Sequence, residues 1–181
     1  LSDVYGSMLA AAGQTAATPW DGTSAGCPVG YLALAGDYAL PVERRWYDEH
    51  PEWFTKPHHD YPAADIPVPT GTPLYAVTNG VVVSTPTSGR CGIGVILNGD
   101  DGAQYTYCHG LPGSHAITTG DRVTVGQYLM DSASTGNSTG PHLHFAIKVD
   151  GTARCPQEFL VSIVSDAPRF PGDLPRGGCT S

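Results

Sequence analysis

From Pro69 onward, the chain alternates short apolar runs with turn-forming residues. Two such runs in PLYAVTNGVVVSTP flank Asn79-Gly80, and two more in CGIGVILNGDDGAQYTYCHG flank the segment NGDDG. Val, Ile, Thr and Tyr favour strands, and Asn-Gly or Asp-Gly between two such runs is typical of a hairpin turn. The pattern therefore predicts short strands on both sides of Asn79-Gly80 and a hairpin over residues 91–110.

A later strand is predicted from His142 to Val149. It follows short strands joined at Gly126 in DRVTVGQYLMDSAS and the polar loop TGNSTGP. Successive side chains of a strand point to opposite faces. One face is then an apolar core stripe, made of Leu143, Phe145, Ile147 and Val149. The other face carries two histidines, His142 and His144, about 6.6 Å apart along the strand.

The same alternation applies to the run YTYCHG, which ends a predicted strand. It puts Tyr105, Tyr107 and His109 on one face and Cys108 on the other. We therefore expect one of the two tyrosines to line a groove beside His109.

The remaining segments carry weaker signals. Residues 1–38 are rich in Ala, Gly, Thr and Ser and are interpreted as an N-terminal arm or linker with one short helix near residues 4–12. The aromatic-rich segment ALPVERRWYDEHPEWFTKPHHDYP is interpreted as irregular chain held by its rings, with the lip of a substrate groove as the alternative. A short helix is predicted to start over residues 156–161. We expect the main domain at residues 39–165 and a Pro/Gly tail at 166–181.

Composition narrows the fold class and the partners. The 181 residues include 23 Gly and 16 Pro, and 14% are charged, which favours one mainly β domain with an antiparallel, sandwich-like sheet, a substrate groove, long loops and little helix. The formal net charge of -8 argues against nucleic acid as a partner. No apolar run approaches the roughly 18 to 20 residues of a membrane span. We expect a monomer, and since the chain begins with Leu1, a processed one.

Five cysteines are scattered along the chain without any CxxC pair. We interpret them as disulfide-forming residues of an oxidising compartment, with buried thiols as the alternative. Cys91 and Cys108 flank the predicted NGDDG hairpin, so cross-strand pairing brings them within disulfide reach. Cys155 has two candidate partners, Cys27 and Cys179.

A His-x-His pair is weak evidence for a site when it stands alone. Here the upstream segment adds His58, His59, Asp60 and Asp65, and the run YTYCHG adds His109. A hydrolytic zinc site needs three protein ligands drawn from His and carboxylate, with a fourth position open. One upstream histidine, one aspartate and one histidine of the His-x-His pair would supply that set.

The segments HHDYPAADIPVPTGTPLYA, YTYCHG and STGPHLHF, in this order, resemble the lysostaphin-like zinc metallopeptidases, whose catalytic domain has a duplicated hybrid motif fold. The similarity covers residues 57–149. That family usually has a histidine four residues before the aspartate, where this chain has Tyr61. We prefer His59 as the upstream ligand, with His58 as the alternative and Asp60 as a less favoured carboxylate.

The resemblance implies one zinc ion bound by His59, Asp65 and His144. It implies His109 and His142 as the catalytic histidines, one of which is the general base. It also implies hydrolysis of peptide bonds in the stem peptides or cross-bridges of bacterial peptidoglycan, outside the cell or at the cell wall. Two alternatives are an inactive homologue that binds cell wall or activates another hydrolase, and a structural zinc or plain β-scaffold protein.

Overall fold

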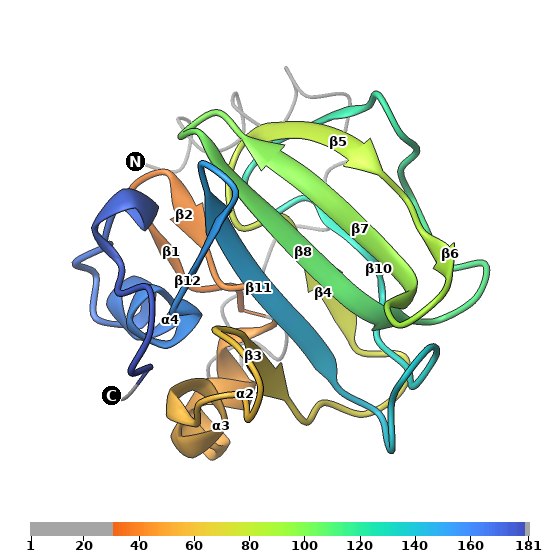
Figure 1. The fold of residues 1–181 in the computed structure, drawn as a ribbon, viewed down its shortest axis with the longest axis horizontal. Coiled ribbons are helices and arrows are strands. Elements are labelled where there is room, and N and C mark those ends of the chain that lie inside the picture. Colours follow the sequence, from red (N-terminus) through yellow and green to blue (C-terminus); the bar gives the residue numbers. More distant parts are fainter. Residues whose placement is uncertain (1–30, 180–181) are drawn as a thin grey trace, which may run out of the picture.

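A curved antiparallel sheet forms the centre of this computed structural model, which describes residues 31–179 (Figure 1). Its strands run in the order β12-β11-β8-β7-β5-β9, while β3 pairs with β11 and β6 pairs with β7. Their bounds are β3 Ala64–Ile66, β5 Gly80–Ser84, β6 Thr87–Ser88, β7 Gly92–Gly99, β8 Ala103–Gly110, β9 Arg122–Val123, β11 Leu143–Val149 and β12 Thr152–Arg154.

Two smaller strand pairs accompany this sheet, and a few short helices lie on its side near β3 and β12 (Figure 1). The pairs are β1 Leu34–Ala35 with β2 Tyr38–Ala39, and β4 Pro73–Tyr75 with β10 Tyr128–Asp131. The helices are α2 Arg44–Glu49, α3 Pro51–Thr55, α4 Pro156–Val164 and the 3-10 turn η1 Pro171–Asp173. The fold is therefore mainly β and antiparallel with little helix, as predicted.

The predicted strands and hairpin form where the pattern put them. β7 and β8 make an antiparallel hairpin around residues 100–102, with Asn98 opposite Gln104. β5 begins at Gly80, which lies opposite Gly99 of β7. A Cβ atom on Gly80 would lie 2.2 Å from the Asn98 carbonyl oxygen, so only glycine fits at this start of the strand.

The core stripe of β11 is also confirmed. Leu143, Phe145 and Ile147 are fully buried, and the Phe145 ring lies 5.3 Å from the ring of Tyr107 on β8. Phe159 of α4 covers the same side, 5.9 Å from the ring of Tyr105. The side chains behind β11 thus form a fixed apolar layer, which leaves the opposite face of the strand for polar residues.

Three expectations for the flanking segments had different outcomes. The predicted helix at residue 156 is α4. The helix expected near residues 4–12 lies outside the described residues, and so does Cys27, a candidate partner of Cys155. The aromatic segment is not irregular: it forms α2 and α3, in which Trp46 stacks on Trp53. Pro51 lies in the first turn of α3, where a helix needs no backbone N–H. This proline therefore separates α2 from α3 and is compatible with both helices.

Two disulfides link segments within residues 31–179. Cys91 and Cys108 are bonded, with Cα atoms 4.8 Å apart, as predicted. Cys155 is bonded to Cys179, one of its two candidate partners. Within residues 31–179, no helix has the length and apolar content needed to cross a membrane.

Candidate metal and catalytic site

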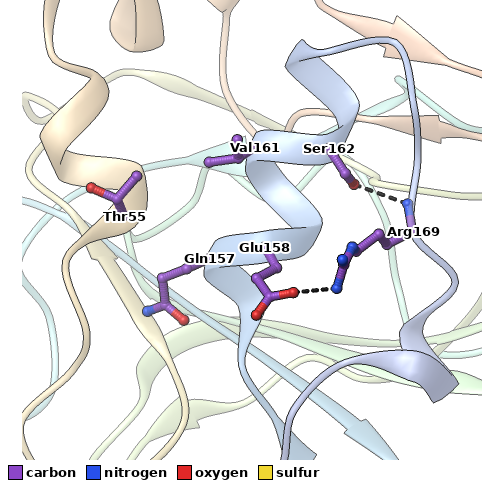
Figure 2. Close-up of a pocket in the computed structure, with 6 residues that line it drawn as sticks. All are labelled: Thr55, Gln157, Glu158, Val161, Ser162 and Arg169. Carbon is purple, nitrogen blue, oxygen red and sulfur yellow. Dashed lines mark hydrogen bonds and ion pairs between the residues drawn. The ribbon is translucent and has the colours of Figure 1, made fainter. Parts of the chain in front are cut away.

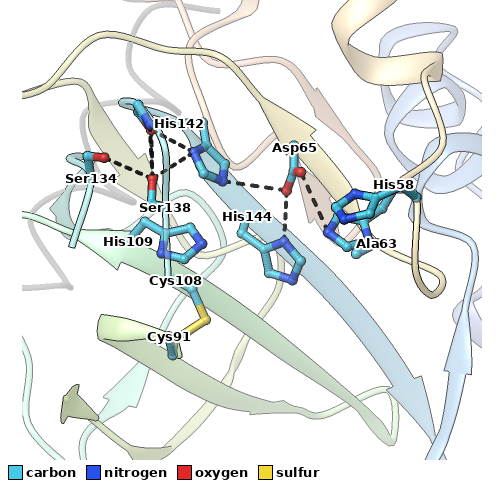
Figure 3. A network of polar contacts seen from close by, with 12 residues as sticks. His58, Ala63, Asp65, Cys91, Cys108, His109, Ser134, Ser138, His142 and His144 are labelled. Carbon is cyan, nitrogen blue, oxygen red and sulfur yellow. Dashed lines mark hydrogen bonds and ion pairs between the residues drawn. A yellow bond between two sulfur atoms is a disulfide. The ribbon is translucent and has the colours of Figure 1, made fainter. Parts of the chain in front are cut away.

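Asp65 and His144 are brought together by strand pairing. β3 lies antiparallel to β11 with Asp65 directly opposite His144, so their side chains share one face of the sheet. His144 Nδ1 lies 2.8 Å from Asp65 Oδ1 (Figure 3). Burial alone would raise the pKa of the Asp65 carboxyl, but the hydrogen bond with His144 and the nearby histidine charges outweigh burial and lower that pKa. Asp65 is therefore an ionised carboxylate at neutral pH.

His58 is the upstream histidine that reaches this pair. Its Nε2 lies 3.7 Å from Asp65 Oδ2, and its ring is 5.1 Å from the ring of His144. The loop that carries His58 is closed by a hydrogen bond from the His58 N–H to the Ala63 carbonyl. The buried Gln157 side chain of α4 donates from Nε2 to the carbonyls of Lys56 and Ala63, which fixes both ends of this loop.

His59 lies apart from Asp65 and His144. Its side chain is 79% exposed and pairs with Asp60, with 3.2 Å between Nε2 and Oδ2. The His58 side chain, in contrast, is only 9% exposed. The geometry therefore favours His58, the alternative in the sequence analysis, over His59. The two rings stack with 4.5 Å between their centroids, so the path of this irregular loop decides which of them faces Asp65, and no strand or helix period could have predicted it.

The residues around Asp65 fit a metal ion. Ligand atoms of His58, Asp65 and His144 lie within 4.8 Å of one another, and two histidines with one carboxylate form a donor set used by catalytic zinc. One local change is required, because the Asp60 N–H donates to His58 Nδ1 over 3.2 Å and so keeps the ring proton on Nε2. With a metal bound at His58 Nε2, the proton of the neutral ring would sit on Nδ1, so the Asp60 N–H would have to give up its contact with that nitrogen. A second group, His58 with His59 and Asp60, meets the same distance limit but is mostly exposed.

His109 reaches the site through an unusual backbone conformation. It has a φ of 67° at the end of β8, in the left-handed region that non-glycine residues seldom adopt. Its ring lies 4.5 Å from the ring of His142 and 5.8 Å from that of His144. The strain is held by the hydrogen bonds of its own N–H and carbonyl, to the Cys91 carbonyl and the Ala133 N–H.

The expectation that Tyr105 or Tyr107 lines a groove beside His109 is wrong. Both tyrosines are fully buried on the core face, and the hydroxyl of Tyr107 accepts a hydrogen bond from the Val77 N–H. Cys108 lies opposite His144, so the disulfide and the histidines share the other face. Strict alternation fails at His109 because its positive φ turns the side chain away from the tyrosine face.

His109 and His142, the two histidines outside the metal-binding group, are held by backbone carbonyls. His109 Nδ1 lies 2.6 Å from the Thr135 oxygen, and His142 Nδ1 lies 2.8 Å from the Gly140 oxygen. A carbonyl only accepts, so each Nδ1 carries a proton and each Nε2 has a free lone pair when the ring is neutral. His142 Nε2 points towards Asp65 Oδ1, 3.6 Å away (Figure 3). Burial lowers the pKa of His109, only partly offset by the Thr135 hydrogen bond, and burial also lowers the pKa of His58.

The loop that supplies these carbonyls is locked to the neighbouring hairpin. A Cβ on Gly136 would lie 2.5 Å from the Arg90 oxygen, and one on Gly92 would lie 2.5 Å from Gly136 N. The Thr135 hydroxyl donates to the Gly110 carbonyl and accepts from the Ile93 N–H. The polar loop TGNSTGP therefore orients His109 and His142 through its Thr135 and Gly140 carbonyls.

A separate pocket lies between α3 and α4 (Figure 2). It has a volume of about 280 Å³ and is lined by Thr55, Gln157, Glu158, Val161, Ser162 and Arg169. Its polar contacts are the ion pair of Arg169 with Glu158 and the hydrogen bond from the Arg169 N–H to Ser162 Oγ. None of the site histidines lines it, so this pocket is distinct from the candidate catalytic site.

Comparison with known proteins gives a consistent assignment. The family model described as peptidase family M23 matches residues 59–156. The chain is 29% identical over 137 residues to the peptidoglycan DD-endopeptidase ShyA of Vibrio cholerae, covering 71% of this chain and 31% of ShyA. It is 38% identical over 99 residues to lysostaphin of Staphylococcus simulans, covering 51% of this chain and 20% of lysostaphin. The chain thus spans a third or less of the length of these curated relatives.

A solved structure supports the same relationship. The catalytic domain of the antimicrobial peptidase lysostaphin from Staphylococcus simulans superposes with a TM-score of 0.55 at 29% sequence identity. The match covers 67% of this chain and 99% of that domain. The matched region therefore corresponds to a complete catalytic domain of that peptidase.

Proposed function

Because the chain belongs to peptidase family M23, we propose that it is a zinc-dependent endopeptidase that hydrolyses peptide bonds in the stem peptides or cross-bridges of bacterial peptidoglycan. The observation that carries this proposal is the convergence of four histidines and one carboxylate on one face of the sheet. His58, Asp65 and His144 supply the metal-binding atoms, and His109 and His142 lie beside them.

The proposed ligands of one zinc ion are His58 Nε2, a carboxylate oxygen of Asp65 and His144 Nδ1. A zinc ion bound there would act as a Lewis acid that activates water and polarises the scissile carbonyl. The chain itself holds these atoms on three segments whose relative positions are fixed: β3, β11 and the loop of His58. β3 and β11 are joined by backbone hydrogen bonds, and Gln157 fixes the loop of His58.

His109 is proposed as the group that takes the proton of the attacking water. Burial favours its neutral form, and the Thr135 carbonyl holds the ring so that Nε2 carries the free lone pair. A neutral ring at neutral pH can accept a proton, which is what a general base must do. The strained backbone at residue 109 is consistent with this role, since such strain is common at active sites.

His142 is proposed as the second acid/base group. When its ring is also protonated at Nε2, it delivers that proton to the leaving amine, and the proton that His109 takes from the water then replaces it. The Nε2 of His142 lies on the Asp65 side of the ring and its Nδ1–H is held by the Gly140 carbonyl. The distance of 4.5 Å between the rings of His109 and His142 leaves both within reach of one reacting bond. The two histidines therefore flank the position where the scissile peptide would bind.

Substrate, location and domain limits are part of the same proposal. The names of ShyA and lysostaphin describe peptidases, and ShyA is a peptidoglycan DD-endopeptidase. A peptidoglycan substrate lies outside the cytoplasm, which agrees with the two disulfides. We propose that the peptidase domain lies within residues 39–165, because the matched residues 59–156 fall inside that range. An inactive homologue was considered because no histidine stands four residues before Asp65. His58 supplies a histidine ligand atom beside Asp65 and His144, which supports an active site.

The test combines metal analysis with digestion of purified peptidoglycan by the wild type and by His142→Ala. The proposal expects about one zinc per chain in both proteins and cleavage by the wild type alone. A zinc-loaded wild type that digests no peptidoglycan, across walls of several cross-bridge types, would contradict it.

A further inference from the structure

Tyr61 contacts His144 at the nitrogen that faces away from Asp65. The Tyr61 hydroxyl lies 2.8 Å from His144 Nε2, while His144 Nδ1 lies 2.8 Å from Asp65 Oδ1. Both ring nitrogens of His144 are thus engaged, one by an acceptor and one by a hydroxyl. The His144 residue as a whole is 6% exposed, so these two contacts fix the ring within a protein environment.

The chemistry of the two partners differs. An ionised carboxylate only accepts hydrogen bonds, whereas a tyrosine hydroxyl both donates and accepts. Without a metal, His144 can donate from Nδ1 to Asp65 and accept the Tyr61 hydroxyl proton at Nε2. A metal at Nδ1 requires that nitrogen to be unprotonated, so the proton of the neutral ring must sit on Nε2. The hydroxyl of Tyr61 can then reverse its role and accept that proton.

We propose that Tyr61 is a positioning residue that holds His144 in the tautomer able to bind a metal through Nδ1. This inference rests on the proposed function, because it takes His144 as a metal ligand. Metal-binding histidines generally donate their other N–H to a fixed partner, which sets the tautomer and the orientation of the ring. Tyr61 is the described residue whose side chain fills that place.

The position of Tyr61 explains how the chain departs from the usual motif. Tyr61 stands four residues before Asp65, where the resemblance leads one to expect a histidine, and His58 stands three residues further upstream. The Tyr61 ring lies 4.7 Å from the ring of His58 and 5.7 Å from that of His144. The residue that replaces the expected ligand therefore contacts two of the three proposed ligands, and the loop fixed by Gln157 positions both.

The test is Tyr61→Phe in the full 181-residue chain, which removes the hydroxyl and keeps the ring that packs on the two histidines. The matched control is Tyr31→Phe, since Tyr31 is 54% exposed and its hydroxyl makes no hydrogen bond within residues 31–179. Zinc affinity is measured by competition with a chelator. We expect Tyr61→Phe to bind zinc about 10- to 100-fold more weakly, and Tyr31→Phe to match the wild type.

A spectroscopic signature separates this role from a merely structural one. In ¹⁵N-labelled protein, zinc loading should move the imidazole proton of His144 to Nε2 in the wild type, with slow exchange because Tyr61 accepts it. In the Tyr61→Phe variant, the proton on His144 Nε2 should exchange faster than in the wild type. If Tyr61→Phe binds zinc with wild-type affinity and shows unchanged His144 signals, the inference about Tyr61 is overturned. If His58→Ala loses zinc in the same experiment, the proposed function still stands. A wild type that binds no zinc would overturn the proposed function as well.

Discussion

Asp65 and His144 face each other across β3 and β11, with 2.8 Å between Oδ1 and Nδ1. The pair depends on strand register, because a shift of one residue would turn either side chain to the apolar face. Leu143 and Phe145, the neighbours of His144, occupy that face and are fully buried. The core stripe of β11 thus fixes which of its residues can reach Asp65.

Replacement of His58 and His59 tests which histidine completes the metal site. His58→Ala should lose zinc binding, because it removes one of three ligand atoms that lie within 4.8 Å of one another. His59→Ala should bind zinc like the wild type, because the His59 side chain is 79% exposed and faces Asp60. Zinc per chain after dialysis distinguishes the two variants. Loss of zinc from His59→Ala with retention in His58→Ala would reverse the assignment.

Replacement of His142 separates metal binding from proton transfer. His142→Ala should retain zinc and lower turnover of a peptidoglycan fragment by about 10²- to 10⁴-fold, since a positioned acid/base group contributes that much. The matched control is His50→Ala, because His50 stacks on Trp53 and makes no contact with the site. Zinc content and kcat are measured on the same samples. Full turnover by zinc-loaded His142→Ala would remove this residue from the mechanism.

The pH dependence of stability reports on His109. Burial lowers its pKa in the folded chain below the ordinary value near 6.5, so folding favours the neutral ring. This contribution is complete above pH 6.5 and is lost as the pH falls through the folded-state pKa. With chelator present, the free energy of unfolding of the wild type should fall more steeply below pH 6.5 than that of His109→Gln. Identical pH profiles for the two proteins would show that folding does not lower the pKa of His109.

Gln157 should contribute to stability and to the metal site together. Its Nε2 donates to the Ala63 carbonyl over 2.7 Å and to the Lys56 carbonyl over 3.1 Å, in a residue that is 1% exposed. Gln157→Leu leaves both acceptors without this donor, so we expect a loss of about 1–3 kcal/mol in the free energy of unfolding and weaker zinc binding.

The control for Gln157 is Gln104→Leu, whose amide donates to the Asn98 side chain in an exposed contact. Its effect on unfolding should stay within about 0.5 kcal/mol. Denaturant titration measures both variants. Equal small losses would mean that the loop of His58 is held without Gln157.

Much of the fold could be predicted because the strands have a clear two-residue period. The hairpin over residues 91–110, the Cys91–Cys108 bond and the core face of β11 all follow from alternation and turn residues. The same rule failed at His109, where a positive φ reverses the face. α2 and α3 were missed because each is short and carries aromatic rings without a sustained helical period.

The candidate site was only partly predictable for a related reason. Asp65, His109, His142 and His144 lie on or at the ends of strands, and sequence analysis named all four. His58 and Tyr61 lie in an irregular loop, where the direction of each side chain depends on tertiary contacts such as that of Gln157. The signal for Tyr61 was its place four residues before Asp65, which marked a departure from the motif without indicating its contact with His144.

Cleavage of peptidoglycan by this chain can be observed by mass spectrometry of purified peptidoglycan after incubation with the zinc-loaded chain. We expect fragments with new amino termini at one type of stem or cross-bridge peptide bond, and we expect these fragments to disappear with chelator or with His142→Ala. Unchanged peptidoglycan from every wall type, with zinc bound to the wild type, would contradict the proposed function.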